Sequence, residues 1–144
     1  MMTAVELLNR HFETLVADPL QWQSLIDDEV LWELPFAPAL GHPARLTGRN
    51  EVVHHVTWFV GAVENFRFFD LRIHPLADPD QAVAEVRAEG VIKETGRMYR
   101  QEYVVFLRSA GGRILSLREY FDPTRAATAL DVPLVALSGP APAI

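Results

Sequence analysis

A glutamate on an apolar strand face is the first candidate for proton chemistry in this sequence. In the predicted strand 113–121, Glu119 alternates in step with Leu115, Leu117 and Phe121, so these side chains share one face. Burying an unpaired carboxylate is costly, and such a group is usually partnered or held in its neutral form. Glu119 is therefore a candidate catalytic acid or base.

Glu102 is a second candidate, because it also alternates with apolar residues in the predicted strand 98–108. If the glycine-rich turn that follows places Arg108 opposite Arg113, Glu102 lies directly across from Glu119 on the same face. Two close carboxyls resist ionising together, so they would titrate as one acid/base unit. The alternative is that each glutamate pairs with an arginine or a backbone group, and a one-residue change of register would separate the two.

Glu33 and His55 complete the set of candidate catalytic residues. Glu33 alternates with large apolar residues in the predicted strand 29–36, although a solvated edge position explains it equally well. In the predicted helix 48–63 only His55 adjoins the apolar stripe, while His54 faces the polar side. His55 is thus a candidate general acid or base, and the alternative is a histidine that is merely hydrogen-bonded.

Four aromatic residues are candidates for the walls of a substrate pocket: Trp32, Trp58, Phe59 and Tyr99. Trp58 lies off the main apolar stripe of its predicted helix. That position fits a subunit contact, a pocket rim or an exposed ring.

Several function classes are disfavoured by what the sequence lacks. There are no cysteines, so a disulfide, a thiolate metal site and a cysteine nucleophile are excluded. The metal, nucleotide and serine-hydrolase motifs HExxH, GxGxxG, GxxxxGK[ST] and GxSxG are absent, and the five histidines are dispersed. We therefore expect no metal site and no cofactor.

Charge and hydropathy bear on the protein's binding partners and on its location in the cell. The formal net charge of -6 and the scattered basic residues argue against binding to nucleic acid. No stretch approaches the roughly 20 apolar residues of a membrane span, and the N-terminus lacks the pattern of a signal peptide. We expect a cytoplasmic protein with no membrane partner.

The elements that position these residues follow from capping signals and periodicity. A Thr3/Glu6 capping box starts a predicted helix over residues 3–17, and Asp18-Pro19 starts a short second helix. A strand, a loop and the third helix follow, and then come β-rich runs near 66–76, 82–93, 98–108 and 113–121. Helices followed by an antiparallel meander are typical of an α+β fold, with the helices on one face of a curved sheet.

The length of 144 residues suits one domain. We assign residues 1–129 to it and residues 130–144 to a proline-containing C-terminal tail. The tail is either a frayed terminus or an arm that packs on its own or a neighbouring subunit.

Three segments resemble the nuclear transport factor 2-like superfamily, specifically its SnoaL-like branch. They are LIDDEVLWELP at 25–35, LTGRNE at 46–51 and the strand that runs from GRI at 112 to REYFDP at 118–123. The resemblance implies a cone-shaped, cystatin-like fold, in which a curved antiparallel or mixed sheet and three N-terminal helices surround a pocket. It also implies a homodimer.

Within that branch, HVTW at 55–58, REYF at 118–121 and ALDVP at 129–133 resemble the phenazine-biosynthesis PhzA/PhzB type. By resemblance, His55 and Glu119 take the places of a histidine and a glutamate that promote imine formation between amino-ketone intermediates. Glu33 occupies the position of the general-base aspartate of ketosteroid isomerase-like relatives. The strand around Tyr99 departs from the phenazine type, so the substrate does not transfer with the fold.

These observations lead to one functional hypothesis and one alternative. The hypothesis is an acid/base enzyme of isomerase, cyclase or condensation type, acting on a small hydrophobic, cyclic or aromatic metabolite in an apolar pocket. His55 and Glu119 would move the proton, and Glu33 or Glu102 would supply a second carboxylate. The alternative is a non-catalytic module of the same fold that binds a small molecule or a protein.

Overall fold

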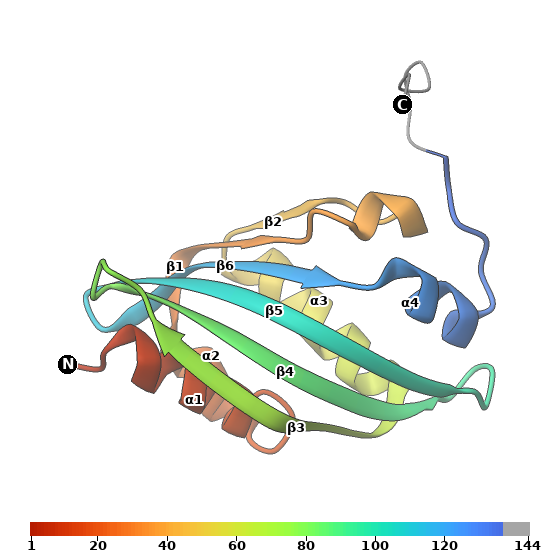
Figure 1. Cartoon of the computed structure of the whole chain (residues 1–144), viewed down its shortest axis with the longest axis horizontal. Helices are drawn as coiled ribbons and strands as arrows, with labels where there is room; N and C mark the ends of the chain where they lie inside the picture. Colours follow the sequence, from red (N-terminus) through yellow and green to blue (C-terminus); the bar gives the residue numbers. More distant parts are fainter. Residues whose placement is uncertain (137–144) are drawn as a thin grey trace.

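The computed structural model describes residues 1–136 (Figure 1). Its elements, in chain order, are α1 (Ala4–Thr14), α2 (Pro19–Leu25), β1 (Ile26–Glu33), the short 3-10 helix η1 (Ala37–Leu40), β2 (Arg45–Thr47), α3 (Arg49–Ala62), β3 (Val63–Pro75), β4 (Gln81–Ile92), β5 (Met98–Ala110), β6 (Arg113–Phe121) and α4 (Pro123–Leu130).

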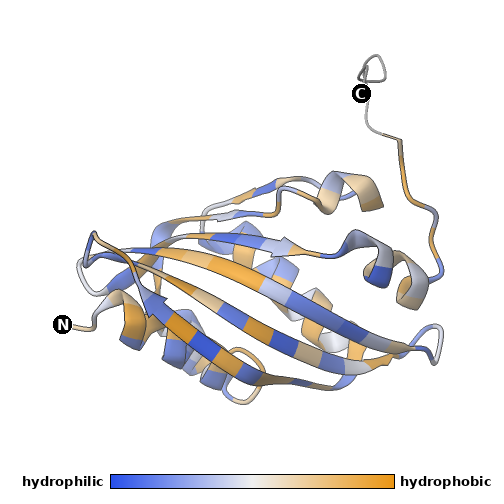
Figure 2. Ribbon diagram, in the orientation of Figure 1, coloured by the Kyte–Doolittle hydropathy of each residue, from blue (hydrophilic) through white to orange (hydrophobic). Residues whose placement is uncertain are grey.

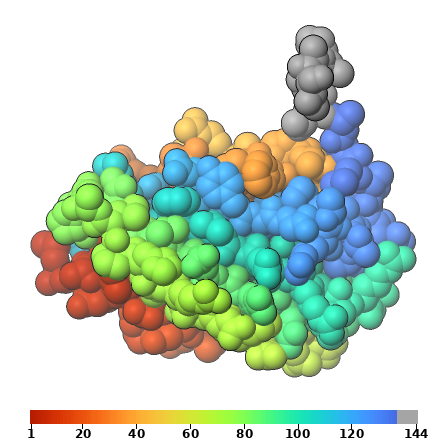
Figure 3. Space-filling model, viewed as in Figure 1, coloured from red at the N-terminus to blue at the C-terminus, as the bar shows by residue number. Residues whose placement is uncertain are grey.

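All six strands form one mixed sheet in the order β2-β1-β6-β5-β4-β3. Neighbouring strands are antiparallel except β1 and β6, which run parallel. The helices α1, α2 and α3 lie behind the sheet in Figure 1, and the side chains of the long strands form the surface that faces the viewer in Figure 3. The predicted α+β class, with three N-terminal helices on one face of a curved sheet, is confirmed.

The capping signals start the first two helices where the sequence predicts. The Thr3 hydroxyl accepts a hydrogen bond from the Glu6 backbone N–H at 3.2 Å, and the Glu6 carboxylate accepts one from the Thr3 N–H at 3.2 Å. Asp18 caps α2 through the Gln21 N–H at 3.3 Å, with Pro19 at the first helical position. Each cap satisfies a backbone donor that a helix start leaves free.

Two elements were not predicted, the first helix ends earlier than predicted, at Thr14, and the first strand is Ile26–Glu33 instead of 29–36. The segment between β1 and α3, expected to be a loop, contains the short strand β2, which pairs with β1. The second is α4, where Asp122 accepts a hydrogen bond from the Thr124 N–H at 2.8 Å and Pro123 opens the helix. This helix runs through the predicted domain boundary at residue 129 to Leu130.

The stretch after α4 contacts its own chain. The Val135 N–H donates to the Ala39 carbonyl of η1 at 2.7 Å, and the Val132 N–H donates to Ala127 at 3.1 Å. The remainder of the predicted tail, residues 137–144, lies outside the described residues. Within residues 1–136, no helix combines the length and the apolar composition that crossing a bilayer requires.

Alternation along the long strands builds the core, and Figure 2 shows hydrophobic and hydrophilic residues taking turns along them. In β5 the residues Tyr99, Gln101, Tyr103, Val105 and Leu107 are buried, whereas those between them are more exposed. The inner face of the sheet therefore carries both the hydrophobic core and a few polar groups.

One buried polar pair joins the first two helices. His11 of α1 is buried, and its Nδ1 accepts a hydrogen bond from the Trp22 indole N–H of α2 at 3.0 Å. Burial lowers the pKa of His11 to about 3. The histidine is therefore neutral in the folded protein throughout the physiological pH range.

This burial predicts an acid-sensitive contribution to stability. Because the folded-state pKa is below the ordinary 6.5, the contribution is fully present above pH 6.5 and is lost as the pH falls towards about 3. The free energy of unfolding, measured with urea, should fall by up to about 3 kcal/mol between pH 6.5 and 4 through this group. His11→Gln should flatten that decline, and His54→Gln, at an exposed position, should not. Equal slopes for wild type and His11→Gln would contradict the assignment.

Candidate functional site

A cavity of about 350 Å³ lies between α3, the inner face of the sheet and the segments η1 and α4. Its volume is in the range of small-molecule sites. Most of its wall is apolar or aromatic, including Leu34, Val56, Phe66, Phe68, Ile92 and Phe121. Of the residues singled out in the sequence, six line it: Trp32, His55, Trp58, Phe59, Tyr99 and Glu119.

The predicted register of the last hairpin is wrong. A tight turn pairs Ala110 with Arg113, and a bulge just before it shifts the pairing by one further residue. As a result Glu119 lies opposite Val105 instead of Glu102. The total shift is odd, and an odd shift moves a side chain to the other face of the sheet.

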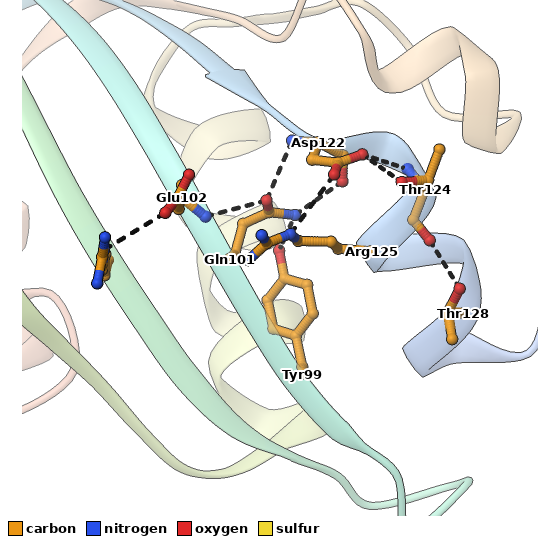
Figure 4. Close-up of polar contacts among 8 residues, drawn as sticks. Tyr99, Gln101, Glu102, Asp122, Thr124, Arg125 and Thr128 are labelled. Carbon is orange, nitrogen blue, oxygen red and sulfur yellow. Dashed lines mark hydrogen bonds and ion pairs between the residues drawn. The ribbon is translucent and has the colours of Figure 1, made fainter.

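Glu102, as a result of this register, and Glu33, for a separate reason, lie outside the cavity. Glu102 is on the outer face, with a carboxylate oxygen 3.4 Å from the Arg87 guanidinium (Figure 4). Glu33 points away from the neighbouring Trp32, as alternation along a strand requires, and lies 3.9 Å from the Arg45 guanidinium. The alternative of an arginine-paired glutamate therefore describes Glu102, and the predicted carboxylate pair does not form. Glu33 also lies near an arginine, but its strand β1 lies between β2 and β6 and is not the edge strand that the alternative for Glu33 assumed.

Glu119 is the carboxylate that β6 presents to the cavity. Among residues 1–136 its carboxyl group has neither a hydrogen-bond partner nor an ion-pair partner. Burial raises its pKa from the ordinary value of 4.5 to about 8. Glu119 is therefore mainly a neutral acid at pH 7 and has a proton to donate.

His55 meets the cavity from α3 within a group of aromatic rings. Its ring centre lies 4.9 Å from that of His42, 6.0 Å from Trp58 and 6.2 Å from Trp32. Burial, together with smaller effects of the nearby His42 and His54, lowers the pKa of His55 to about 4. His55 is therefore neutral at pH 7 and can accept a proton.

The relation between His55 and Glu119 is indirect. Both line the same cavity, but no hydrogen bond joins them in the described part of the chain. A bound molecule would have to connect the two groups. Trp58 stands at the rim with 52% of its surface exposed, in contact with His55 and Phe59.

Sequence reasoning missed four polar residues of this region, one of which is Glu94 in the turn between β4 and β5. His42, from the segment after η1, joins His55 at the cavity, and nothing in the sequence periodicity links the two. The other two are Gln101 and Tyr103, which share the inner face of β5 with Tyr99 and could have been found from their period-two spacing. Within residues 1–136, no three carboxylate or imidazole groups gather closely enough to hold a metal ion.

The raised pKa of Glu119 makes a prediction about stability. Because the folded-state pKa exceeds the ordinary 4.5, the favourable contribution is complete below pH 4.5 and is lost as the pH rises through about 8. Glu119→Gln, which stays neutral, should therefore unfold with a higher free energy than wild type at pH 9, by up to a few kcal/mol. The difference should shrink towards pH 4.5 in urea titrations. A variant less stable than wild type at pH 9 would show that the carboxylate is not buried unpaired.

Comparison with known proteins identifies related sequences. The model of the SnoaL-like domain family matches residues 6–117 of the chain. An uncharacterized PhzA/B-like protein of Pseudomonas aeruginosa is 33% identical over 130 residues, which cover 90% of this chain and 91% of that protein.

Solved structures share the fold. A Bacillus subtilis protein provisionally named an isomerase superposes with a TM-score of 0.82 at 26% identity, covering 92% of this chain and 96% of that one. A phenazine biosynthesis-related protein of Pseudomonas aeruginosa gives a TM-score of 0.77 at 18% identity, covering 94% and 85% of the two chains.

Proposed function

The chain belongs to the SnoaL-like domain family, and we propose that it is an acid/base enzyme for a neutral cyclic or aromatic small molecule bound in the cavity. The observation that carries the proposal is the opposite displacement of two pKa values in one cavity, with Glu119 raised to about 8 and His55 lowered to about 4. Pairs of titratable groups driven apart in this way are typical of acid/base assignments.

The chemistry that suits this pair is proton transfer next to a carbonyl group. The neutral His55 ring removes a proton from the carbon beside the carbonyl, and the bond electrons form the carbon–carbon double bond of an enol. Glu119 supplies the proton that the carbonyl oxygen takes up. Return of a proton to a different carbon gives isomerisation, whereas attack of the enol carbon on a second carbonyl gives cyclisation or condensation.

The wall of the cavity favours an uncharged ring compound. Glu119 and His55 are both neutral at pH 7, so neither of them offers a charge to offset that of an ionic ligand. The aromatic side chains Trp32, Phe59 and Tyr99 provide flat apolar surface. Proteins of the same fold include ones named for phenazine biosynthesis and polyketide cyclisation, which supports the cyclase or isomerase class.

The non-catalytic alternative keeps the same cavity and ligand class. It is favoured by the absence, within residues 1–136, of a direct hydrogen bond between His55 and Glu119. It predicts ligand binding without turnover. The homodimer and the cytoplasmic location expected from the sequence stay predictions.

Hydrogen–deuterium exchange tests the acid/base proposal without knowledge of the natural substrate. With 2-tetralone in D2O, kcat/KM for exchange of the α-protons, followed by NMR, should rise with pH through about 4 and fall through about 8. Below the first value His55 is protonated and cannot accept a proton. Above the second value Glu119 is ionised and cannot donate one.

Substitutions complete that experiment. His55→Ala and Glu119→Gln should each lower the exchange rate by about 10²- to 10⁴-fold. Glu102→Gln, which alters a carboxylate on the outer face, is the matched control and should leave the rate unchanged. Wild-type rates in both cavity variants would refute the assignment and favour the binding module.

A further inference from the structure

Two buried tyrosines share a hydrogen bond at the cavity wall. The hydroxyl oxygens of Tyr99 and Tyr103, two positions of the inner face of β5, are 2.8 Å apart. Both residues line the cavity that holds Glu119. Either hydroxyl can be the donor, so the direction of the bond depends on their other partners.

Gln101, which lies between the two tyrosines in sequence, is one of those partners (Figure 4). Its side-chain oxygen accepts hydrogen bonds from the backbone N–H groups of Asp122 at 3.0 Å and Glu102 at 3.1 Å. These two donors fix the orientation of the amide, since only its oxygen can accept them. The amide nitrogen then donates to the Asp122 carbonyl at 2.9 Å and to the Tyr99 hydroxyl at 3.2 Å.

A count of protons leaves one phenol proton unused. The Tyr99 oxygen accepts from Gln101, and one of the two phenol protons forms the bond between Tyr99 and Tyr103. The other phenol proton has no acceptor among residues 1–136, whichever tyrosine carries it. No hydrogen bond in that part of the chain joins either hydroxyl to Glu119.

A second donor at the cavity is also unused. Trp32 is 4% exposed and lines the same cavity, and its indole N–H is buried without a hydrogen-bond partner in the described part of the chain. Burying a donor without a partner is unfavourable, because the donor loses its hydrogen bonds to water. The unused phenol proton and the unpaired indole N–H belong to residues that line one cavity, and a ligand oxygen is an acceptor that either of them lacks.

We propose that the Tyr99–Tyr103 pair donates its unused proton to a carbonyl oxygen of the ligand, with the Trp32 indole N–H as a second donor and Gln101 as the positioning residue. The ligand class is a neutral ring compound that carries a ketone. This inference rests on the proposed function in using the same cavity and a carbonyl-bearing ligand, but it concerns binding and needs no turnover.

Two probes of the same shape test it. The two probes differ in one position: 2-acetylnaphthalene has a carbonyl oxygen where 2-isopropenylnaphthalene has a =CH2 group. The dissociation constant of each is measured by equilibrium dialysis, and the stretching frequency of a ¹³C-labelled ketone by infrared spectroscopy. In wild type the frequency of the bound ketone should be lower than in hexane, because a donor polarises the carbonyl.

The double variant Tyr99→Phe/Tyr103→Phe should weaken ketone binding by about tenfold, leave the hydrocarbon unchanged and reduce the frequency shift. Each single variant should lose less, since one phenol proton then remains free. Trp32→Phe should also weaken the ketone selectively. Tyr120→Phe, which removes a hydroxyl on the outer face of the sheet, is the matched control and should change neither probe.

Gln101→Glu tests the positioning role while both tyrosines stay in place. An ionised carboxylate there would accept the proton of Tyr99, and Tyr103 would donate to Tyr99, so no phenol proton would be left. At pH 8 this variant should lose the frequency shift as fully as the double variant does. A merely structural role for Gln101 would leave the frequency of the bound ketone at its wild-type value.

The outcomes separate this inference from the proposed function. A double variant that binds the ketone with wild-type affinity and frequency would overturn the inference, as would a wild type that binds no ketone. If the binding results hold but His55→Ala and Glu119→Gln exchange protons at the wild-type rate, the carbonyl site stands and the acid/base proposal falls.

Discussion

The chemistry of the cavity depends on one constraint: in the part of the chain that the structure describes, the Glu119 carboxyl group is buried without a charged or hydrogen-bonding partner. Ionising such a group in apolar surroundings is unfavourable, so its pKa rises to about 8 and the acid stays neutral at pH 7. An arginine beside it would stabilise the fold at neutral pH but would remove the proton. The site therefore gives up some stability to keep a carboxylic acid able to donate.

The surroundings of His55, which lines the same cavity from α3, likewise keep its side chain neutral. Burial and two neighbouring imidazoles disfavour its charged form, so it stays a free base. The tyrosine pair and the indole of Trp32 then add neutral hydrogen-bond donors. The ligand that we propose, a neutral ring compound with a ketone, suits these groups because it needs hydrogen-bond donors and no opposite charge.

The sequence predicts well where local chemistry decides the structure. Caps at Thr3 and Asp18 start the helices, and alternation puts Glu119 on the inner face of its strand. The fate of Glu102 was not predictable, because it depends on turn length and on one bulge, and either changes the register without changing the apolar pattern. The Asp122-Pro123 start of α4 carries the same signal as Asp18-Pro19, so that helix could have been predicted, but the contacts of Gln101 with it could not.

The most direct test is the titration of the Glu119 carboxyl group itself. Carboxyl ¹³C NMR of protein labelled at glutamate, with the Glu119 signal assigned by its loss in Glu119→Gln, gives the pKa of this one group. The structure predicts a midpoint near 8, well separated from those of exposed glutamates. A midpoint near 4.5 would mean that the carboxylate is solvated or paired. It would contradict both the neutral state of Glu119 at pH 7 and its role as an acid.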